Sequence, residues 1–198
     1  MTPAARAWAG LAALLATAAI VLSGIDATAL DWQPALALRE PWRAFSAVAV
    51  HYSALHLAAN LAGTALVAAL GVAARVPARM VGAWACAWPL TQLGLLARPD
   101  LLHYGGLSGV LHAGAAVVAT HLLLRGPPAR RLIGAALAAG LVVKVFGEAP
   151  WGSPLRISTD WDFATAPLAH ASGLVAGVVC ALVAAVSRRR PPAIADDV

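Results

Sequence analysis

The sequence predicts an all-α polytopic membrane protein with six membrane-spanning helices. Hydrophobic residues make up 61% of the 198 residues, charged residues only 12%, and the mean hydropathy is +0.76. A soluble domain ordinarily carries about 25% charged residues. The apolar residues also occur in long runs, close to the roughly 20 residues that a helix needs to cross a bilayer. Length alone allows one or two soluble domains, but the hydropathy favours a membrane protein.

Six apolar runs are separated by linkers that hold turn formers and charges. The predicted spans are 7–25, 52–73, 80–97, 106–124, 131–147 and 166–187. Much of their apolar content is alanine with scattered glycine, which allows neighbouring helices to approach closely. The sequence shows no fixed-period repeat and no low-complexity tract. We therefore expect residues 1–190 to form a single membrane domain and residues 191–198 to form a short cytoplasmic tail.

The first span resembles a secretory signal peptide in part. Arg6 precedes its apolar run, and the triplet Ala27-Thr28-Ala29 after it is typical of a cleavage site. The run is longer than a usual signal core, so we expect it to remain as a membrane span.

The linkers between spans differ in charge from one side to the other. One side carries nine basic residues: Arg6, Arg75, Arg79, Arg125, Arg130, Arg131, Arg188, Arg189 and Arg190. The other side carries four, which are Arg39, Arg43, Arg98 and Arg156, and it also carries the acidic residues of the linkers. Cytoplasmic loops are enriched in Lys and Arg. The asymmetry, with an even number of spans, predicts that both termini are cytoplasmic.

Other function classes fit the composition poorly. The net charge of +5 does not indicate nucleic acid as a partner, because the basic residues form short clusters between apolar runs and not a basic face. Cys86 and Cys180 both lie inside apolar runs, without the spacing of a metal site or a disulfide framework. We expect two small buried thiols, no metal and no cofactor.

Polar side chains inside spans are costly, so each is a functional candidate. The second span opens with HYSALHLAAN, residues 51–60. His56 and Asn60 are four residues apart and share a helix face, and His51 lies at the helix mouth. Hydrogen bonds between helices would account for such residues as well as a site would. A metal is a poor fit, since this set has no carboxylate or thiol.

The fourth span opens with GGLSG, residues 105–109. A helix that begins near Ser108 would offer unpaired backbone N–H groups and the positive end of its dipole. Such donors stabilise a developing oxyanion. The alternative interpretation is a simple helix start with a small-residue packing face.

The sixth span contains AHASGLVAG, residues 169–177. His170, Gly173 and Gly177 lie on one helix face, and the two glycines form a stripe that admits a neighbouring helix. We expect that neighbour to be the helix that carries Ser108 and Gly109. A lone histidine at a helix interface remains the alternative.

All three groups lie at the outer ends of their spans, at a similar membrane depth. A serine nucleophile needs a base within hydrogen-bonding reach and donors for the oxyanion. Ser108 with His170 provides the nucleophile and a base within reach. The backbone N–H of Ser108, together with Asn60 and His56, would provide the donors for the oxyanion. No acidic third member is evident, so the sequence predicts a Ser-His dyad.

The three motifs, in this order and on these spans, resemble the rhomboid intramembrane serine proteases. The resemblance covers the whole chain, and Trp42-Arg43 is similar to the family's signature in the first outer loop. It implies a six-helix rhomboid-like bundle without a cofactor. It also implies that Ser108 is the nucleophile and His170 the base.

The same resemblance implies roles for the residues around the pair. His56 and Asn60 would line the oxyanion hole, with His51 at the water-accessible mouth and Gly106 shaping the turn before the nucleophile. Many rhomboids carry an aromatic residue, often tyrosine, where this chain has His112. His112 would then stack on His170 or compete with it for the serine proton.

The compact chain, the G-L-S-G-x-L-H form and the pair Lys144 and Glu148 look most like the rhombosortase branch. Lys144 and Glu148 are four residues apart, and a local ion pair would also explain them. The resemblance implies a bacterial inner-membrane enzyme whose site opens toward the periplasm. It implies membrane-anchored substrates with a C-terminal Gly-Gly motif, an apolar span and a basic tail. His103, in the outer loop, receives no role.

Two other function classes remain open at this point. A non-catalytic rhomboid-like binding protein would lack the nucleophile or the base, and the sequence contains candidates for both. A small transporter would show repeats, broken helices and polar groups near the middle of the bilayer, whereas here the polar groups lie at one end. The natural substrate and the oligomeric state are not indicated by the sequence.

Overall fold

The computed structural model describes residues 1–159 and 161–187, and these residues form helices joined by turns and loops. The predicted tail and the basic residues Arg188–Arg190 lie outside the described residues. The helices are α1 (Pro3–Val21), α2 (Ala27–Leu30), η1 (Pro34–Leu36), α3 (Arg43–Ser46), η2 (Ala47–Ala49), α4 (Ala54–Ala74), α5 (Ala78–Leu93), η3 (Gly94–Ala97), α6 (Ser108–Arg125), α7 (Pro128–Gly147) and α8 (Pro167–Val186). Each predicted span overlaps a long helix, with η3 continuing α5, and the largest shift is at the first span, where the helix begins and ends four residues earlier than predicted.

Five of the long helices are long and apolar enough to cross a membrane. They are α1, α4, α5 with its extension η3, α6 and α8. The sixth, α7, has sufficient length at 20 residues, but Arg130, Arg131 and Lys144 lower its hydropathy. The all-α class is therefore confirmed, and length and composition support five of the six spans.

The expectation of two buried thiols is wrong. Cys86 is exposed and Cys180 is only partly buried, because both line a groove along α5 and α8 and do not enter the core.

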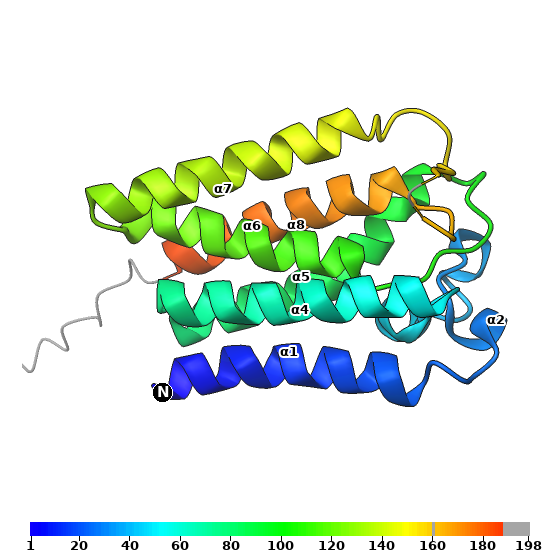
Figure 1. The fold of residues 1–198 in the computed structure, drawn as a ribbon, viewed down its shortest axis with the longest axis horizontal. Helices are drawn as coiled ribbons and strands as arrows, with labels where there is room; N and C mark the ends of the chain where they lie inside the picture. The colour runs from blue at the N-terminus through cyan, green and yellow to red at the C-terminus, as the bar shows by residue number, and fades with distance from the viewer. Residues whose placement is uncertain (160, 188–198) are drawn as a thin grey trace, which may run out of the picture.

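The helices pack around α6, which is the most buried of the five candidate spans. It contacts α4, α5, α7 and α8, and α1 packs on α4 and α5 (Figure 1). The core at α1 is built on tryptophan: the rings of Trp8 and Trp84 lie 4.4 Å apart. Their indole N–H groups donate to the backbone carbonyls of Val67 and Val110, at 3.0 and 2.9 Å. These two buried indole groups are thus satisfied by the backbones of neighbouring helices.

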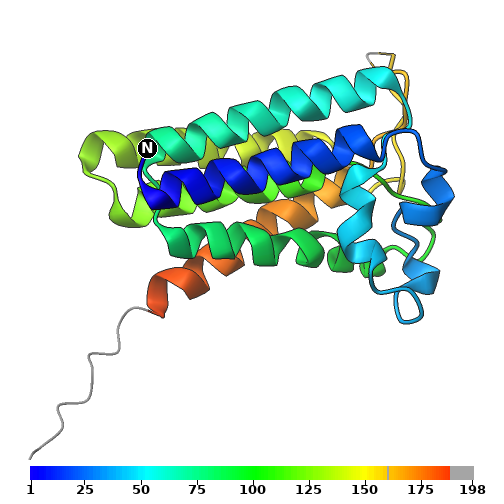
Figure 2. The same cartoon turned by 90° about the horizontal axis from the view of Figure 1, so that it is seen from below.

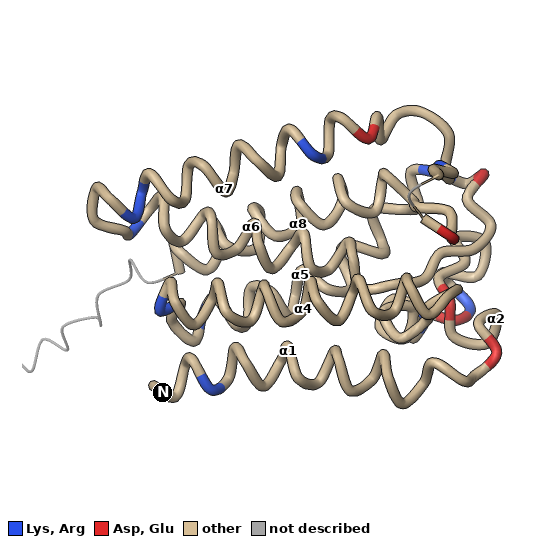
Figure 3. Tube along the Cα trace, in the orientation of Figure 1, with Lys and Arg blue, Asp and Glu red and all other residues tan. Residues whose placement is uncertain are grey.

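The two ends of the bundle differ in charge, as the sequence predicts. Arg6, Arg75, Arg79, Arg125, Arg130 and Arg131 gather at one end, which carries no acidic residue among those described (Figure 3). The described acidic residues lie at the opposite end, here called the acidic end. The loop after α7 and the segment between α1 and α4 are both at the acidic end (Figures 1 and 2).

The segment between α1 and α4 is organised around a buried ion pair. Arg43 and Asp31 are both nearly inaccessible, and Arg43 donates to the backbone carbonyls of Thr28 and Asp31, both at 2.9 Å. The imidazole of His103 also binds the Asp31 carboxylate, at 2.7 Å. The outer-loop arginine singled out in the sequence is therefore a structural anchor for this segment.

This outer segment supports the chain that leads to α6. Trp32 and Tyr104 exchange two backbone hydrogen bonds, of 2.7 and 2.9 Å. The N–H of Gly106 donates to the carbonyl of Ala47 at 2.9 Å. The residues just before Ser108 are thereby held by backbone contacts to the first loop.

Candidate active site

Close packing between α6 and α8 brings Ser108 and His170 together. A Cβ added to Gly173 would lie 1.9 Å from the carbonyl oxygen of Gly109, and one added to Gly177 would lie 2.3 Å from that of Ala113. A larger residue at position 173 or 177 would require the backbone of α6 or α8 to move. The glycine stripe therefore admits α6, as predicted, and places the outer ends of the two helices side by side.

Ser108 is the first residue of α6, and its hydroxyl faces His170 on α8. Ser108 Oγ and His170 Nε2 are 2.9 Å apart, an ordinary hydrogen-bond distance. The imidazole is almost wholly buried, while Ser108 is partly accessible. The structure therefore brings the predicted nucleophile and base into direct contact.

A carboxylate, which the dyad prediction did not include, contacts the other nitrogen of His170. His170 Nδ1 lies 2.5 Å from Glu148 Oε2, and the second carboxylate oxygen lies 2.5 Å from Lys144 Nζ. Burial alone would raise the pKa of Glu148, but His170 and Lys144 outweigh it and lower the pKa to about 2. The predicted local pair of Lys144 and Glu148 is thus confirmed, and it extends to His170.

The missed contact has a simple cause. Glu148 lies 22 residues before His170 in the chain, and no helical spacing links residues on different helices. The only local signal was an acidic residue at the outer end of a span, which a nearby lysine already explained. Identifying its partner requires knowing that the end of α7 approaches the start of α8.

His112 stacks on His170 and leaves the Ser108 hydroxyl to it. The two ring centroids are 4.3 Å apart and the planes are 16° from parallel. His112 Nδ1 lies 2.7 Å from the backbone carbonyl of Ser108. Since a carbonyl only accepts hydrogen bonds, that nitrogen carries the proton. The sequence leaves open whether His112 stacks on His170 or competes with it for the serine proton, and this geometry matches stacking.

His56 and Asn60 point toward the turn before Ser108. Gly106 has φ +122°, a conformation that favours glycine. A Cβ added there would lie 2.7 Å from His56 Nε2 and 3.5 Å from Asn60 Nδ2. The backbone N–H of Tyr52 donates to His56 Nδ1 at 3.4 Å, which leaves the proton of a neutral ring on Nε2. Two side-chain N–H groups therefore face the space beside the nucleophile.

Aromatic and imidazole rings surround His56 at the acidic end. Phe163, in the loop after α7, stacks on His56 with ring centroids 4.0 Å apart, and His51 meets the same ring edge-on at 4.8 Å. Burial lowers the pKa of His51, which keeps this neighbour neutral at physiological pH. Phe163 was not singled out in the sequence, because a lone aromatic residue in a loop carries no periodic signal.

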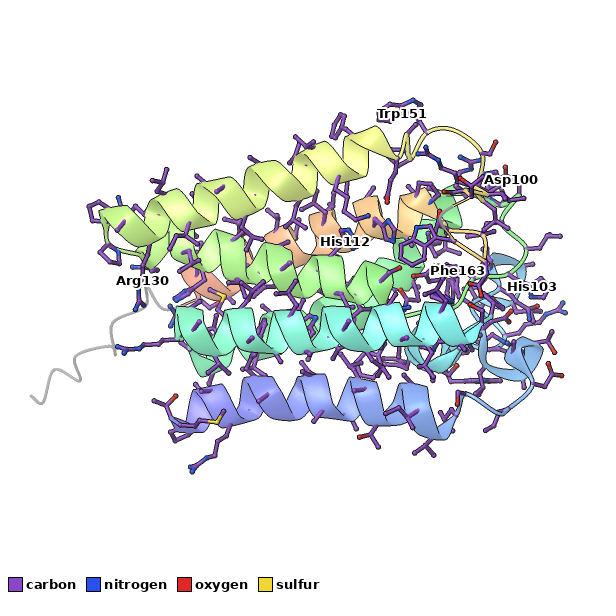
Figure 4. All side chains as sticks on the ribbon, in the orientation of Figure 1. Asp100, His103, His112, Arg130, Trp151 and Phe163 are labelled. Carbon is purple, nitrogen blue, oxygen red and sulfur yellow. The ribbon has the colours of Figure 1, made fainter. Side chains whose placement is uncertain are left out.

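Most of these polar groups line one cavity of about 340 Å³. Its polar lining consists mainly of His56, Asn60, Ser108, His112, Lys144, Glu148 and His170, and its remaining walls are largely apolar. Figure 4 shows Phe163 toward the same end of the bundle as Asp100 and His103, Arg130 at the opposite end, and His112 between them. The cavity is concave, mostly apolar and equipped with a few convergent polar groups, as small-molecule and substrate sites are.

Two of the supporting residues contact the site's neighbours. His51 lies three residues before α4 and meets His56 edge-on, and Gly109 packs on α8, where a Cβ would lie 2.8 Å from the carbonyl oxygen of Ala169. His103, which received no role, binds the Asp31 carboxylate in the outer segment.

Neither a scan against protein-family models nor a search of curated proteins finds a match to this chain. A function is therefore supported by the geometry of this cavity and by the sequence motifs that form it.

Proposed function

We propose that this chain is an intramembrane serine endopeptidase of the rhomboid type. The observation that carries the proposal is the 2.9 Å hydrogen bond between Ser108 and His170 inside a cavity that also presents two N–H donors. A nucleophile, a base and an oxyanion site in one concave, mostly apolar place are the elements of acyl transfer.

In the first step, Ser108 Oγ attacks the carbonyl carbon of a peptide bond. The hydroxyl proton passes to His170 Nε2 as the new C–O bond forms. The electron pair of the carbonyl moves to its oxygen and produces a tetrahedral oxyanion. His170 becomes positively charged in this step.

The oxyanion is stabilised by donors that are already in place. The backbone N–H of Ser108 has no helical partner because it lies in the first turn of α6. His56 Nε2 and Asn60 Nδ2 are the side-chain donors on the opposite wall, beside Gly106. Donors fixed in advance require no reorganisation when the charge develops.

The intermediate then collapses to an acyl-enzyme. The C–N bond breaks, the amine leaves with the proton from His170, and the acyl group stays on Ser108 Oγ. A water molecule then attacks the ester carbonyl and gives a proton to His170. The C–O bond to Ser108 breaks, Ser108 Oγ takes that proton back from His170, and the carboxylic acid is released. A primary amine in place of the water would transfer the acyl group and form a new amide.

The proposed setting is a bacterial inner membrane crossed by six helices, α7 included. The basic end lies in the cytoplasm together with both termini, since positive residues favour that side. The acidic end, with the cavity, faces the periplasm, where water reaches the acyl-enzyme. Membrane-anchored proteins with a Gly-Gly motif before an apolar span and a basic tail are the substrates that the rhombosortase resemblance suggests.

Cleavage of such a substrate in proteoliposomes tests the proposal. The wild-type chain is expected to release the periplasmic part of the substrate, and Ser108→Ala and His170→Ala are expected to abolish release. A fluorophosphonate probe should label the wild-type chain at Ser108 and leave Ser108→Ala unlabelled. Equal cleavage by the wild type and Ser108→Ala, or no labelling of a folded sample, would contradict the proposal.

A variant on α4, the helix that carries His56 and Asn60, serves as a control for loss of folding. Thr64 lies one turn below Asn60, and its hydroxyl donates to the carbonyl of Asn60 without lining the cavity. Thr64→Val should therefore keep both cleavage and labelling.

A further inference from the structure

Four polar side chains form one continuous series from α6 to α7. Ser108 Oγ contacts His170 Nε2, His170 Nδ1 contacts Glu148 Oε2, and Glu148 Oε1 contacts Lys144 Nζ. The series uses both nitrogens of the imidazole and both oxygens of the carboxylate. Each contact is within hydrogen-bonding distance, so the position of any one group constrains the next.

The carboxylate of Glu148 fixes where the proton of His170 lies. An ionised carboxylate only accepts hydrogen bonds, so the proton of a neutral His170 must be on Nδ1. Nε2 is then left with its lone pair facing the Ser108 hydroxyl. Without an acceptor at Nδ1, the ring could carry its proton on Nε2, where it cannot take the proton of the serine.

Burial strengthens the electrostatic interaction between His170 and Glu148. The side chain of His170 is 7% exposed and that of Glu148 is 22% exposed, so water screens their interaction only in part. The positive charge that His170 acquires during attack on a carbonyl forms directly beside the negative carboxylate. The charged state of the pair is thus stabilised where hydration would otherwise be weak.

We propose, on the basis of the proposed peptidase function, that Glu148 is a positioning residue that completes a Ser108–His170–Glu148 triad. Lys144 holds the second oxygen of Glu148 and keeps the carboxylate turned toward α8. His112 covers one face of the His170 ring, so the ring is fixed both at its edge and at its face. Glu148 acts through His170 and does not contact the substrate.

Comparison of Glu148→Gln, Glu148→Asp and Lys144→Met with the wild type tests this role. Loss of the corresponding acid in serine-protease triads lowers kcat by about 10⁴. Glu148→Gln is expected to lower kcat by a factor of that order and to leave KM nearly unchanged. Glu148→Asp should restore part of the rate. Lys144→Met should cause a smaller loss, because Glu148 can still accept from His170.

The matched control is Asp100→Asn. Asp100 is another carboxylate at the acidic end, but it pairs with Arg98 at 2.9 Å and does not contact His170. This variant should retain the wild-type kcat. A similar loss in Asp100→Asn and Glu148→Gln would overturn the assignment, since the effect would then reflect charge at that end of the bundle in general.

A second readout needs no turnover. In a sample labelled with ¹⁵N-histidine, with the His170 signals assigned from His170→Ala, the wild type should show a protonated Nδ1 and an unprotonated Nε2. Glu148→Gln should show loss of that fixed tautomer. An unchanged tautomer together with an unchanged kcat would overturn the proposal. A fixed tautomer in a chain that cleaves nothing would keep the positioning role and refute the peptidase function.

Discussion

The imidazole ring of His112 lies nearly parallel to that of His170, with centroids 4.3 Å apart. Stacking covers one face of the His170 ring. The hydrogen bond from His112 Nδ1 to the carbonyl of Ser108 fixes the His112 ring against the start of α6. His112 therefore serves as a spacer between the nucleophile's own backbone and the base.

This arrangement predicts that any aromatic ring at position 112 is sufficient to hold the His170 ring in place. His112→Phe keeps a flat surface against His170, so it should retain most of the cleavage rate, whereas His112→Ala should lose more because the ring of His170 is released. Rates of cleavage and of fluorophosphonate labelling measure both variants. An inactive but folded His112→Phe would instead indicate that His112 takes the serine proton.

The donors beside Gly106 provide a second prediction. Removal of one oxyanion donor typically costs about 10²–10³ in rate. His56→Ala and Asn60→Ala should each lower kcat by a factor of this order without preventing folding, which circular dichroism and thermal unfolding would check. Unchanged kinetics in both variants would exclude their role in the oxyanion site, and Thr64→Val serves as the control on the same helix.

The glycine stripe on α8 predicts a loss of stability as well as activity. Gly173→Ala would place a Cβ 1.9 Å from the carbonyl oxygen of Gly109 and force the two helices apart. Overpacking of this kind costs about 1–3 kcal/mol, and sometimes more. Thermal unfolding should show a lower Tm, and cleavage should fall. Gly140→Ala in α7, where a Cβ meets nothing within 4 Å, should leave both unchanged.

The buried ion pair of the outer segment predicts a large effect for Arg43→Ala. Removing one partner of a buried pair leaves an uncompensated charge, at a cost of about 3–5 kcal/mol. Asp31 would keep Gln33 on the oxygen that faces Arg43, and His103 and Tyr52 on its second oxygen, but no arginine to balance its charge. The free energy of unfolding should fall, whereas the nearby exposed Arg39→Ala should have little effect. Equal stabilities of the two variants would contradict the anchoring role.

The low pKa of Glu148 predicts a specific dependence of stability on pH. Burial opposes ionisation, but His170 and Lys144 lower the pKa to about 2, compared with about 4.3 for an ordinary glutamate. The folded state therefore binds fewer protons than the unfolded state between these values. Its extra stability is complete above about pH 4.3 and is lost as the pH falls toward 2.

Comparison of thermal unfolding in the wild type and Glu148→Gln from pH 6 to pH 3 checks this sign. The Tm difference that favours the wild type should shrink as the pH falls below the ordinary glutamate range. A difference that is constant over this interval would show that the ionised carboxylate does not contribute.

Periodicity and charge were sufficient to predict most of the fold. Long apolar runs must become helices if they lie in a membrane, so the six ranges correspond to α1, α4, α5, α6, α7 and α8. The glycines at 173 and 177 predicted the α6–α8 contact because only close approach explains two small residues on the face of His170.

The groups that sequence reasoning missed depend on contacts between helices and loops far apart in the chain. Glu148 reaches His170 only because the outer end of α7 meets the start of α8, and Phe163 reaches His56 only because the loop after α7 folds back over α4. His103 follows the same rule, since its partner Asp31 lies 72 residues away. A local pattern specifies which side chains share a helix face, but it does not specify which helices become neighbours.

The seam between α6 and α8 also bears on how such a site can be lost. The short distance between Ser108 and His170 depends on the absence of side chains at Gly173 and Gly177, which lie one and two turns deeper in the bundle. A descendant chain that gained a single methyl group there would still contain every reactive group of the site. It would then lose activity through spacing alone, with no change in any residue that takes part in the chemistry.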